Sequence, residues 1–541
     1  MSAWLASHDG HVAAAQLLTW LALLAVAAPH VRAALAATPR WLLVTLAALA
    51  AGAFAVSGWW IPAFDRFVPL GHEASYASCF AGHVTPANAH GWEPFVTYPI
   101  LRWGYWSLGG LVGRETIEAA LALNLAARSL TVVVVGLASA ALFRRPEAGV
   151  LAAALLALHP AHALWGAAIY NVAIPLLFAA ICVWLAILAW RDGSPAMLAA
   201  AAASGCLVVA TRIEWGVLAP CLALLLFGGL SSDWGRSPAV RTVRFWAPAA
   251  GVVLLLGGAT LLGPGSLTNQ GGYHDPLGYL ETLGRQVWIL DFLEPLQRPW
   301  ALALFAVGAV WTLRRVHGCI RLLSGLFGAA VLAHGAMATF NDFAFRHELL
   351  AVLFLCLLGG AAGPAVVDAW RAGGSQRGLA AGTAALLVAT VASALVALAD
   401  TADRYYMNEE AFFAAHPGFQ STEIPHASLE DGRCYLITDN ERLWERGLAG
   451  SHFNLMEPGE AALHWQEHGG CIRWLLDDGD HRADGLAVRP RAIKLARWFD
   501  WTLIGYARFP DGNDAVVYEM ASPPWGLTAP PPGWRWEVES E

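Results

Sequence analysis

A group of polar side chains follows one of the most apolar runs of the chain. The segment "PLGHEASYASCF", residues 69–80, places Glu73 directly after His72. A carboxylate in such a position can accept the proton of an attacking hydroxyl group, or stabilise the positive charge that develops at an anomeric carbon. A neutral histidine can also act as a base near pH 7. The sequence therefore makes Glu73 and His72 the candidate catalytic residues.

Arginines at two further points of the chain suit a ligand that carries a phosphate. Arg212 lies in "VVATRIEWGVL", two residues before Glu214, and Arg346 lies in "FNDFAFRHELL", directly before His347. The planar guanidinium group matches phosphate oxygens and keeps its charge when it is partly desolvated. We therefore expect Arg212 and Arg346 to bind the phosphate of a donor. Glu214 and His347 are expected to orient these arginines.

Aromatic and amide side chains are candidates for lining the same site. Trp92 belongs to "WEPFVTYPILRWGYW", which has the composition of an interfacial aromatic belt and alternatively stacks on a sugar. Tyr76 and Trp92 are expected to border the sugar or the acceptor. Tyr170 and Asn171, in "LHPAHALWGAAIYNV", are expected to line the substrate.

Several ionisable residues near the apolar runs have simpler structural explanations. The Arg212–Glu214 pair alternatively completes a turn at the membrane interface. His159 and His162 fit ordinary interfacial histidines better than metal ligands. Arg128, inside an apolar run, would satisfy either backbone carbonyl groups or a neighbouring acid. A divalent metal stays open as a cofactor, but the sequence shows no ligand cluster that demands one.

The composition is that of a membrane protein. Hydrophobic residues make up 57% of the 541 residues and charged residues only 14%, and the mean hydropathy is +0.49. Apolar runs of about 20 residues, enough to cross a bilayer, recur along the chain, so the sequence predicts an α-helical polytopic protein of about twelve transmembrane helices. The predicted spans lie near 12–31, 41–61, 119–142, 148–165, 170–190, 195–212, 215–231, 245–263, 299–313, 321–338, 347–363 and 378–399.

Arginine placement predicts the orientation of these spans. Alternate connections carry the positive charge, and cytoplasmic connections collect such charge. The arginines concerned are Arg32, Arg40, Arg144, Arg145, Arg191, Arg236, Arg241, Arg244, Arg314, Arg315, Arg321, Arg371 and Arg377. The long loops 62–118 and 264–298 then fall on the extracytoplasmic side. Basic residues form no tract or stripe, so nucleic acid is not an expected partner.

The composition changes near residue 401, which predicts a transmembrane domain over 1–400 and a small soluble α/β domain over 401–541. "GRCYLITDNERLWERGL" indicates a strand and then a helix, and "GGCIRWLLDDGD" a second strand. "WTLIGYARF" and "DAVVYEM" are typical of a hairpin joined through "PDGND". Cys434 and Cys471 occupy equivalent positions at two strand starts. On the oxidising, extracytoplasmic side they are able to form a structural disulfide if those strands are neighbours.

The order of these features resembles the GT-C superfamily of integral membrane glycosyltransferases, in the branch of protein O-mannosyltransferases and bacterial lipid A aminoarabinose transferases. "GHEASYA" stands where that branch has an acidic pair followed by a tyrosine. "NLAARSLTVVVVGLASAALFRR" matches its "RLPSALFGLL" helix, "VVATRIEWGVLAP" its "LLTKGP" turn, and "FRHELLAVLFLCLLGG" its "RYLLPLLPALALL" segment. The resemblance covers about residues 41–363, by pattern more than by identity.

The resemblance implies an enzyme of a bacterial cytoplasmic (inner) membrane that moves a sugar from a polyprenyl-phosphate donor to a hydroxyl acceptor on a lipid, a glycan or a protein. It implies inversion at the anomeric carbon and no nucleotide-sugar pocket. Consistently, the chain has no Walker-type loop, and Lys494 is its only lysine.

Two departures from the family pattern leave other functions open. His72 replaces the first acid of the pair, and Asn171 stands where an aspartate is common. These replacements favour, as an alternative, a non-catalytic assembly or binding protein on the same scaffold. A transporter or flippase for lipid-linked saccharides is the other alternative; it predicts internal repeats, which the sequence does not show.

Overall fold

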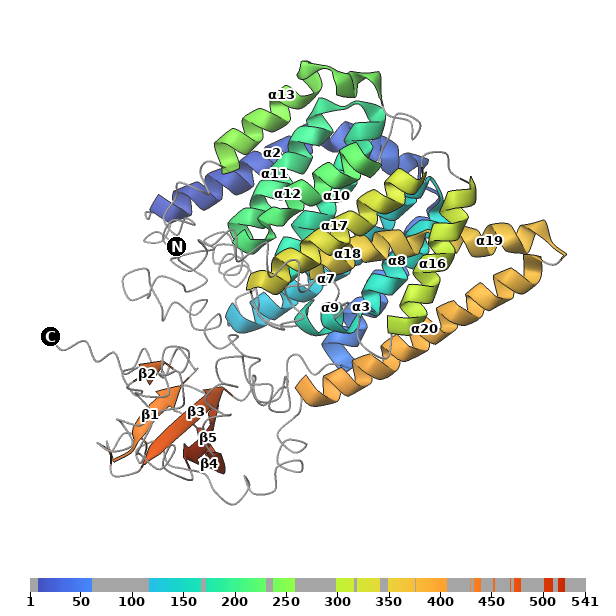
Figure 1. The fold of residues 1–541 in the computed structure, drawn as a ribbon. Coiled ribbons are helices and arrows are strands. Elements are labelled where there is room, and N and C mark those ends of the chain that lie inside the picture. Colours follow the sequence, from blue (N-terminus) through green and yellow to red (C-terminus); the bar gives the residue numbers. More distant parts are fainter. Residues whose placement is uncertain are drawn as a thin grey trace, which may run out of the picture. The chain divides into compact units, whose positions relative to one another are not determined.

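The computed structural model describes residues 8–60, 116–166, 172–229, 237–257, 298–315, 319–340, 349–374, 376–405, 429, 433–438, 451–452, 468, 471–477, 501–508 and 514–520. These residues divide near Thr401 into a helical unit and a unit built on a β-sheet (Figure 1).

The helical unit consists of long apolar helices that break at several points. Its longer helices are α2 (His8–Ala37), α3 (Arg40–Ala55), α7 (Thr116–Phe143), α10 (Ala173–Asp192), α11 (Pro195–Thr211), α16 (Arg298–Arg315), α17 (Cys319–Phe340) and α20 (Gln376–Tyr405). Shorter helices are α8 (Pro146–Ala157), α9 (Pro160–Gly166), α12 (Leu218–Ala223), α13 (Val243–Val252), α18 (Leu349–Gly360) and α19 (Ala362–Ala372). Single turns of 3₁₀ helix are η2 (Ile213–Val217) and η5 (Pro238–Arg241), and π-helical turns are η1 (Val56–Trp60), η3 (Leu224–Gly229) and η6 (Val253–Gly257).

Six stretches of the described helices are long and apolar enough to cross a membrane: Ala14–Ala37, Arg40–Gly58, Leu121–Phe143, Ala173–Asp192, Leu349–Ala372 and Gln376–Val396. Six shorter apolar stretches, of 10 to 17 residues, also lie in the described part of the chain. Every span expected from the sequence coincides, over most of its length, with described helix, but the number of crossings stays a prediction. The expected span over 148–165 is interrupted, because α8 ends at Ala157 and α9 begins at Pro160.

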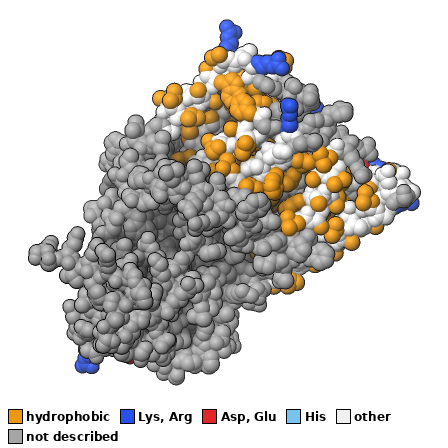
Figure 2. All heavy atoms as spheres, viewed as in Figure 1, with side chains coloured by type: hydrophobic (Ala, Val, Ile, Leu, Met, Phe, Trp, Pro, Cys, Tyr) orange, Lys and Arg blue, Asp and Glu red, His pale blue; other side chains and the backbone are white. Residues whose placement is uncertain are grey.

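The interior of the helical unit is formed by helices that are apolar on all sides. All twelve residues of α18 are buried, and so are fifteen residues of α10. Helices α2, α3 and α13 instead expose large apolar side chains, such as Leu18 (66%), Val44 (69%) and Val243 (81%). Figure 2 shows hydrophobic side chains gathered over a broad area, with arginines at its margin. This is the outward surface that a bilayer requires.

Close packing of α7 and α8 rests on two facing glycines. A Cβ atom added to Gly149 of α8 would lie 2.5 Å from the backbone oxygen of Gly136 in α7. At such a distance the backbones themselves must separate, because no side chain is present to move aside. Gly149 therefore sets the spacing of α7 and α8, and with it the position of the α7–α8 connection.

The second unit is a five-stranded sheet in the order β2-β1-β3-β5-β4. Its strands are β1 (Tyr435–Thr438), β2 (Ser451–His452), β3 (Ile472–Asp477), β4 (Trp501–Arg508) and β5 (Asp514–Met520). β1 is parallel to β2 and β3, whereas β5 is antiparallel to β3 and β4. The predicted hairpin is confirmed, since Arg508 pairs with Asp514 across its turn. The helix predicted after the first strand lies outside the described residues.

A disulfide joins Cys434 and Cys471, which precede the neighbouring strands β1 and β3. Tyr435 donates its backbone N–H to the Cys471 carbonyl oxygen at 3.0 Å, so backbone and side chains hold the same two points together. The cysteines are 37 residues apart in the sequence. Closing a loop of this size lowers the entropy of the unfolded chain.

Gly149→Ala is expected to destabilise the helical unit by about 1–3 kcal/mol, because the added methyl group meets backbone. Gly382→Ala in α20 is the matched control, since a Cβ atom there meets nothing within 4 Å. This control is expected to be neutral or to stabilise by about 0.5–1 kcal/mol. Thermal unfolding of both variants in detergent, followed by tryptophan fluorescence, checks the difference. Equal melting temperatures would contradict the assigned contact.

Removal of the disulfide by Cys434→Ser with Cys471→Ser is expected to cost the sheet unit about 2–4 kcal/mol. Alkylation of the denatured wild-type protein without reductant, followed by peptide mass spectrometry, should leave Cys434 and Cys471 unmodified while buried cysteines such as Cys356 react. Alkylation of Cys434 and Cys471 under those conditions would refute the pairing.

Candidate functional site

Most of the predicted site lies outside the described residues. This holds for Glu73, His72, Tyr76, Trp92, Tyr170, Asn171, Arg346 and His347. Glu214 is described by its backbone alone, within η2. Arg212 is the predicted ligand-binding side chain that the structure describes in full, and the geometry of the site is therefore built from Arg212 and the helix breaks around it.

Arg212 stands at the point where α11 stops. Its backbone is extended (φ −160°, ψ 98°), its N–H donates to the Val208 carbonyl oxygen at 2.7 Å, and its own carbonyl accepts from the Trp215 N–H at 3.1 Å. The chain then continues as the 3₁₀ turn η2 and the short helix α12. Arg212 thus joins two helical segments. Its positive charge lies at the carbonyl end of α11, where the helix dipole favours a cation.

The side chain of Arg212 is almost completely buried, at 1% exposure, and its guanidinium carbon lies 5.2 Å from the centre of the Trp215 ring. Trp215 is itself fully buried. A guanidinium group over an indole face is held by cation–π attraction, which is strongest where water is excluded. Trp215 was not predicted from the sequence as a partner. The spacing of three residues in "RIEW" is the signal that could have identified it.

A second break in the helices surrounds Arg128 of α7. Arg128 is fully buried and donates to three backbone carbonyl groups: Nε to His162 O at 3.0 Å, Nη2 to Ala157 O at 2.8 Å, and Nη1 to Ala53 O. These carbonyls belong to α9, α8 and α3. Of the two roles predicted for Arg128, the structure shows the first, in which it satisfies backbone carbonyls.

Two neighbouring side chains, those of His162 and Ser57, also bind backbone carbonyl groups at this helix junction. His162 places Nδ1 at 2.9 Å from the Leu156 carbonyl oxygen, and a carbonyl only accepts, so Nδ1 carries the proton. Ser57 in η1 donates to the Ala163 carbonyl at 3.0 Å. A Cβ atom on Gly166 would lie 2.3 Å from Cδ of Arg128, so a glycine lets the guanidinium reach α9. His162 therefore stabilises the junction between α8 and α9.

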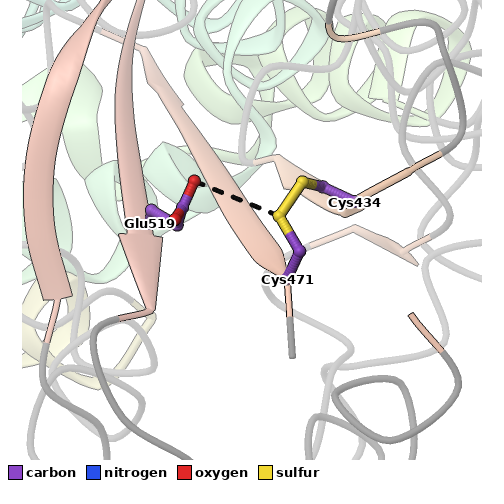
Figure 3. A group of neighbouring side chains, drawn as sticks. All are labelled: Cys434, Cys471 and Glu519. Atoms are coloured by element: carbon purple, nitrogen blue, oxygen red, sulfur yellow. Dashed lines mark hydrogen bonds between the residues drawn. A yellow bond between two sulfur atoms is a disulfide. The ribbon is translucent and has the colours of Figure 1, made fainter. Parts of the chain in front are cut away.

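One group of described residues has the spacing of metal ligands: Cys434, Cys471 and Glu519 (Figure 3). A Glu519 carboxylate oxygen lies 4.0 Å from Sγ of Cys471 and accepts from Nε of Arg473 at 3.0 Å. Both sulfur atoms belong to the disulfide, and a disulfide sulfur is not the thiolate that a metal needs. Within the described residues this group is a structural element of the sheet.

No protein-family model matches the chain, and no curated protein sequence is significantly similar to it. Solved structures are similar in fold. The oligosaccharyltransferase AglB from Archaeoglobus fulgidus, in complex with an inhibitory peptide and a dolichol-phosphate, has a TM-score of 0.50 at 13% identity, over 91% of this chain and 75% of that one. The apo form of the A. fulgidus oligosaccharyltransferase gives 0.52 at 13% identity, over 88% and 74%.

ArnT from Cupriavidus metallidurans, bound to undecaprenyl phosphate, has a TM-score of 0.46 at 15% identity, over 91% of this chain and 100% of that one. The likeness to the oligosaccharyltransferase structures shows the fold. The chain shares the fold of these oligosaccharyltransferase structures and is a multi-pass membrane protein, so the fold expected from the sequence is confirmed.

Replacement of Arg128 by Met is expected to destabilise the helical unit by about 3 kcal/mol or more, because three buried carbonyl groups lose their donors. Arg371→Met is the matched control, since Arg371 is exposed at the end of α19. The midpoint of thermal unfolding in detergent measures both changes. Similar small shifts in the two variants would exclude Arg128 as the residue that holds the three helices together.

Proposed function

We propose that this protein transfers a sugar from a polyprenyl-phosphate donor to a hydroxyl acceptor at the extracytoplasmic face of a bacterial cytoplasmic membrane. The observation that carries the proposal is Arg212, a buried arginine held over a tryptophan ring at a helix break. It occurs in a membrane fold shared with an oligosaccharyltransferase whose structure contains a dolichol-phosphate. A buried guanidinium group suits a lipid-linked phosphate, because its planar shape matches phosphate oxygens and it keeps its charge when it is desolvated.

In the proposed reaction, the acceptor hydroxyl gives its proton to the Glu73 carboxylate, with His72 as the neighbouring base. The acceptor oxygen forms the new bond to the anomeric carbon. The bond between that carbon and the phosphate oxygen breaks, and its electron pair stays on the departing phosphate. A single displacement of this kind inverts the anomeric centre.

The arginines act on the leaving group in this proposal. Arg212 and Arg346 bind the polyprenyl phosphate, which gains negative charge as its bond to the sugar breaks, so their stabilisation is greatest in the transition state. Glu214 and His347 orient the two arginines.

The remaining predicted residues enclose the sugar and acceptor. Tyr76, Trp92, Tyr170 and Asn171 line the substrate, and residues 401–541 form a soluble domain on the same side of the membrane.

The replacement of a family acid by His72 favours one other function, a binding protein that holds lipid-linked saccharide without turnover. Binding and turnover must therefore be measured on the same preparation.

The test uses membranes that contain equal amounts of wild type, Glu73→Gln, Arg212→Gln or the exposed control Arg371→Gln, with a panel of radiolabelled polyprenyl-phosphate sugars. Wild type and control are expected to release free polyprenyl phosphate and to label an acceptor. Glu73→Gln is expected to keep donor binding and to lose about 10²–10⁴-fold in turnover, the usual contribution of a general base. Arg212→Gln is expected to weaken donor binding.

Each other outcome selects a different function. Unchanged turnover in Glu73→Gln would indicate that His72, and not Glu73, is the general base. Donor binding without turnover in wild type would establish the binding protein. Neither binding nor turnover with any donor would overturn the proposal.

A further inference from the structure

A pocket of about 670 Å³ lies among helix ends that carry arginines. It is bounded by the end of α2, the start of α3, the α7–α8 connection and the last turns of α10. Apolar side chains on its walls include Leu42, Leu137, Trp184 and Leu188. The described residues that line this pocket all belong to the helical unit.

Three arginines line the same pocket: Arg144, Arg145 and Arg191. No acidic residue is among the described residues that line it. Arg191 has a 3.3 Å contact from Nε to the carboxylate of Asp192, and such partly exposed pairs between neighbours are weak. The pocket therefore combines apolar side chains with a concentration of positive charge.

The three arginines are held in different ways. Arg145 is fixed by ion pairs with Asp368 at 2.9 Å and Glu147 at 3.1 Å. Trp311 donates to the same Asp368 carboxylate at 3.0 Å. These contacts compensate the charge of Arg145 and anchor one wall of the pocket. Arg144 and Arg191 also line the pocket, and Arg144 is exposed.

Arg144 stands in an unusual backbone conformation between α7 and α8. Its φ of 55° is the only positive value at a non-glycine residue in the described chain. A residue with a Cβ atom is strained in this region, and such strain persists where a ligand site or a tight connection requires it. A glycine would relieve the strain, yet the chain has an exposed arginine at this point.

In the membrane orientation that arginine placement predicts, the pocket lies at the head-group level. Pro39 lines it, and Trp41, two residues further along, is 51% exposed, as expected for a tryptophan at the interface of membrane and water. From this level the exposed apolar side chains of the two neighbouring helices continue into the bilayer region; they include Val44 on α3 and Val26 on α2. A ligand in the pocket with attached acyl chains would have an apolar surface beside it.

We propose that this pocket binds the phosphate head group of an anionic phospholipid, with Arg144 and Arg191 as its ligands and the acyl chains along α2 and α3. Guanidinium groups bind phosphodiester oxygens through paired hydrogen bonds. Basic pockets between transmembrane helices on the arginine-rich side of a membrane have the charge and location that anionic head groups require. The site is independent of the sugar-transfer reaction and is a property of the helical fold.

Native mass spectrometry of the full-length, delipidated protein tests the proposal with three probes: phosphatidylglycerol, phosphatidylcholine of identical acyl chains, and soluble glycerol 3-phosphate. Wild type is expected to bind phosphatidylglycerol more tightly than the other two probes. Arg144→Gln with Arg191→Gln is expected to raise the Kd for phosphatidylglycerol about tenfold or more, the loss that follows when charge-assisted hydrogen bonds are removed. Arg144→Lys with Arg191→Lys is expected to retain most of the binding, and Arg371→Gln all of it.

Two results would overturn the proposal. One is equal phosphatidylglycerol affinity in wild type and the double glutamine variant. The other is binding of phosphatidylcholine or glycerol 3-phosphate as tightly as phosphatidylglycerol by wild type, which would mean a general lipid surface or a free-anion site. If the double glutamine variant does not fold, the single variants Arg144→Gln and Arg191→Gln decide, each with an expected increase in Kd.

Discussion

The contact on which the helical unit depends is the guanidinium group of Arg128 with the carbonyl oxygens of Ala53, Ala157 and His162. Helices that end inside a bilayer leave carbonyl groups without water to solvate them, and each such group is costly. One arginine satisfies carbonyls from three helices at once. The charge is stabilised by the dipoles it faces, and the helices are fixed to a common point.

Arg212 is also a buried arginine at a helix break, but its surroundings differ from those of Arg128. At Arg212 the guanidinium lies against Trp215 beyond the end of α11, so the ring face and the helix dipole share the stabilisation of its charge. Arg128 donates to carbonyl groups of three helices, whereas Arg212 lies over the ring of Trp215 at the end of α11. The proposed reaction assigns phosphate binding to Arg212 because it is a buried arginine at a helix break.

Sequence patterns predicted the helical segments well, because long apolar runs between arginines have few alternatives to a membrane helix. Strands β1, β3, β4 and β5 and the hairpin followed from alternation and turn residues, as at "ARFPDGNDAV", whereas the two-residue strand β2 (Ser451–His452) was not predicted. The break after Ala157 was missed although Pro160 stands in the sequence, since a continuous apolar run masks the end of a helix. Glu73 and its neighbours were chosen from residue type and family pattern, and their placement stays a prediction.

Contacts between distant segments were beyond sequence reasoning. Arg145 and Asp368 are 223 positions apart, and no local sequence pattern predicts that the start of α8 contacts α19. Arg145 and Arg144 are neighbours in the chain and equal in charge, but the first is neutralised by carboxylates and the second lies on a pocket wall in a strained conformation. The function of an arginine in this protein is therefore set by which oxygens the fold brings to it: backbone carbonyls for Arg128, carboxylates for Arg145 and, as we propose, the phosphate oxygens of a lipid ligand for Arg144 and Arg212.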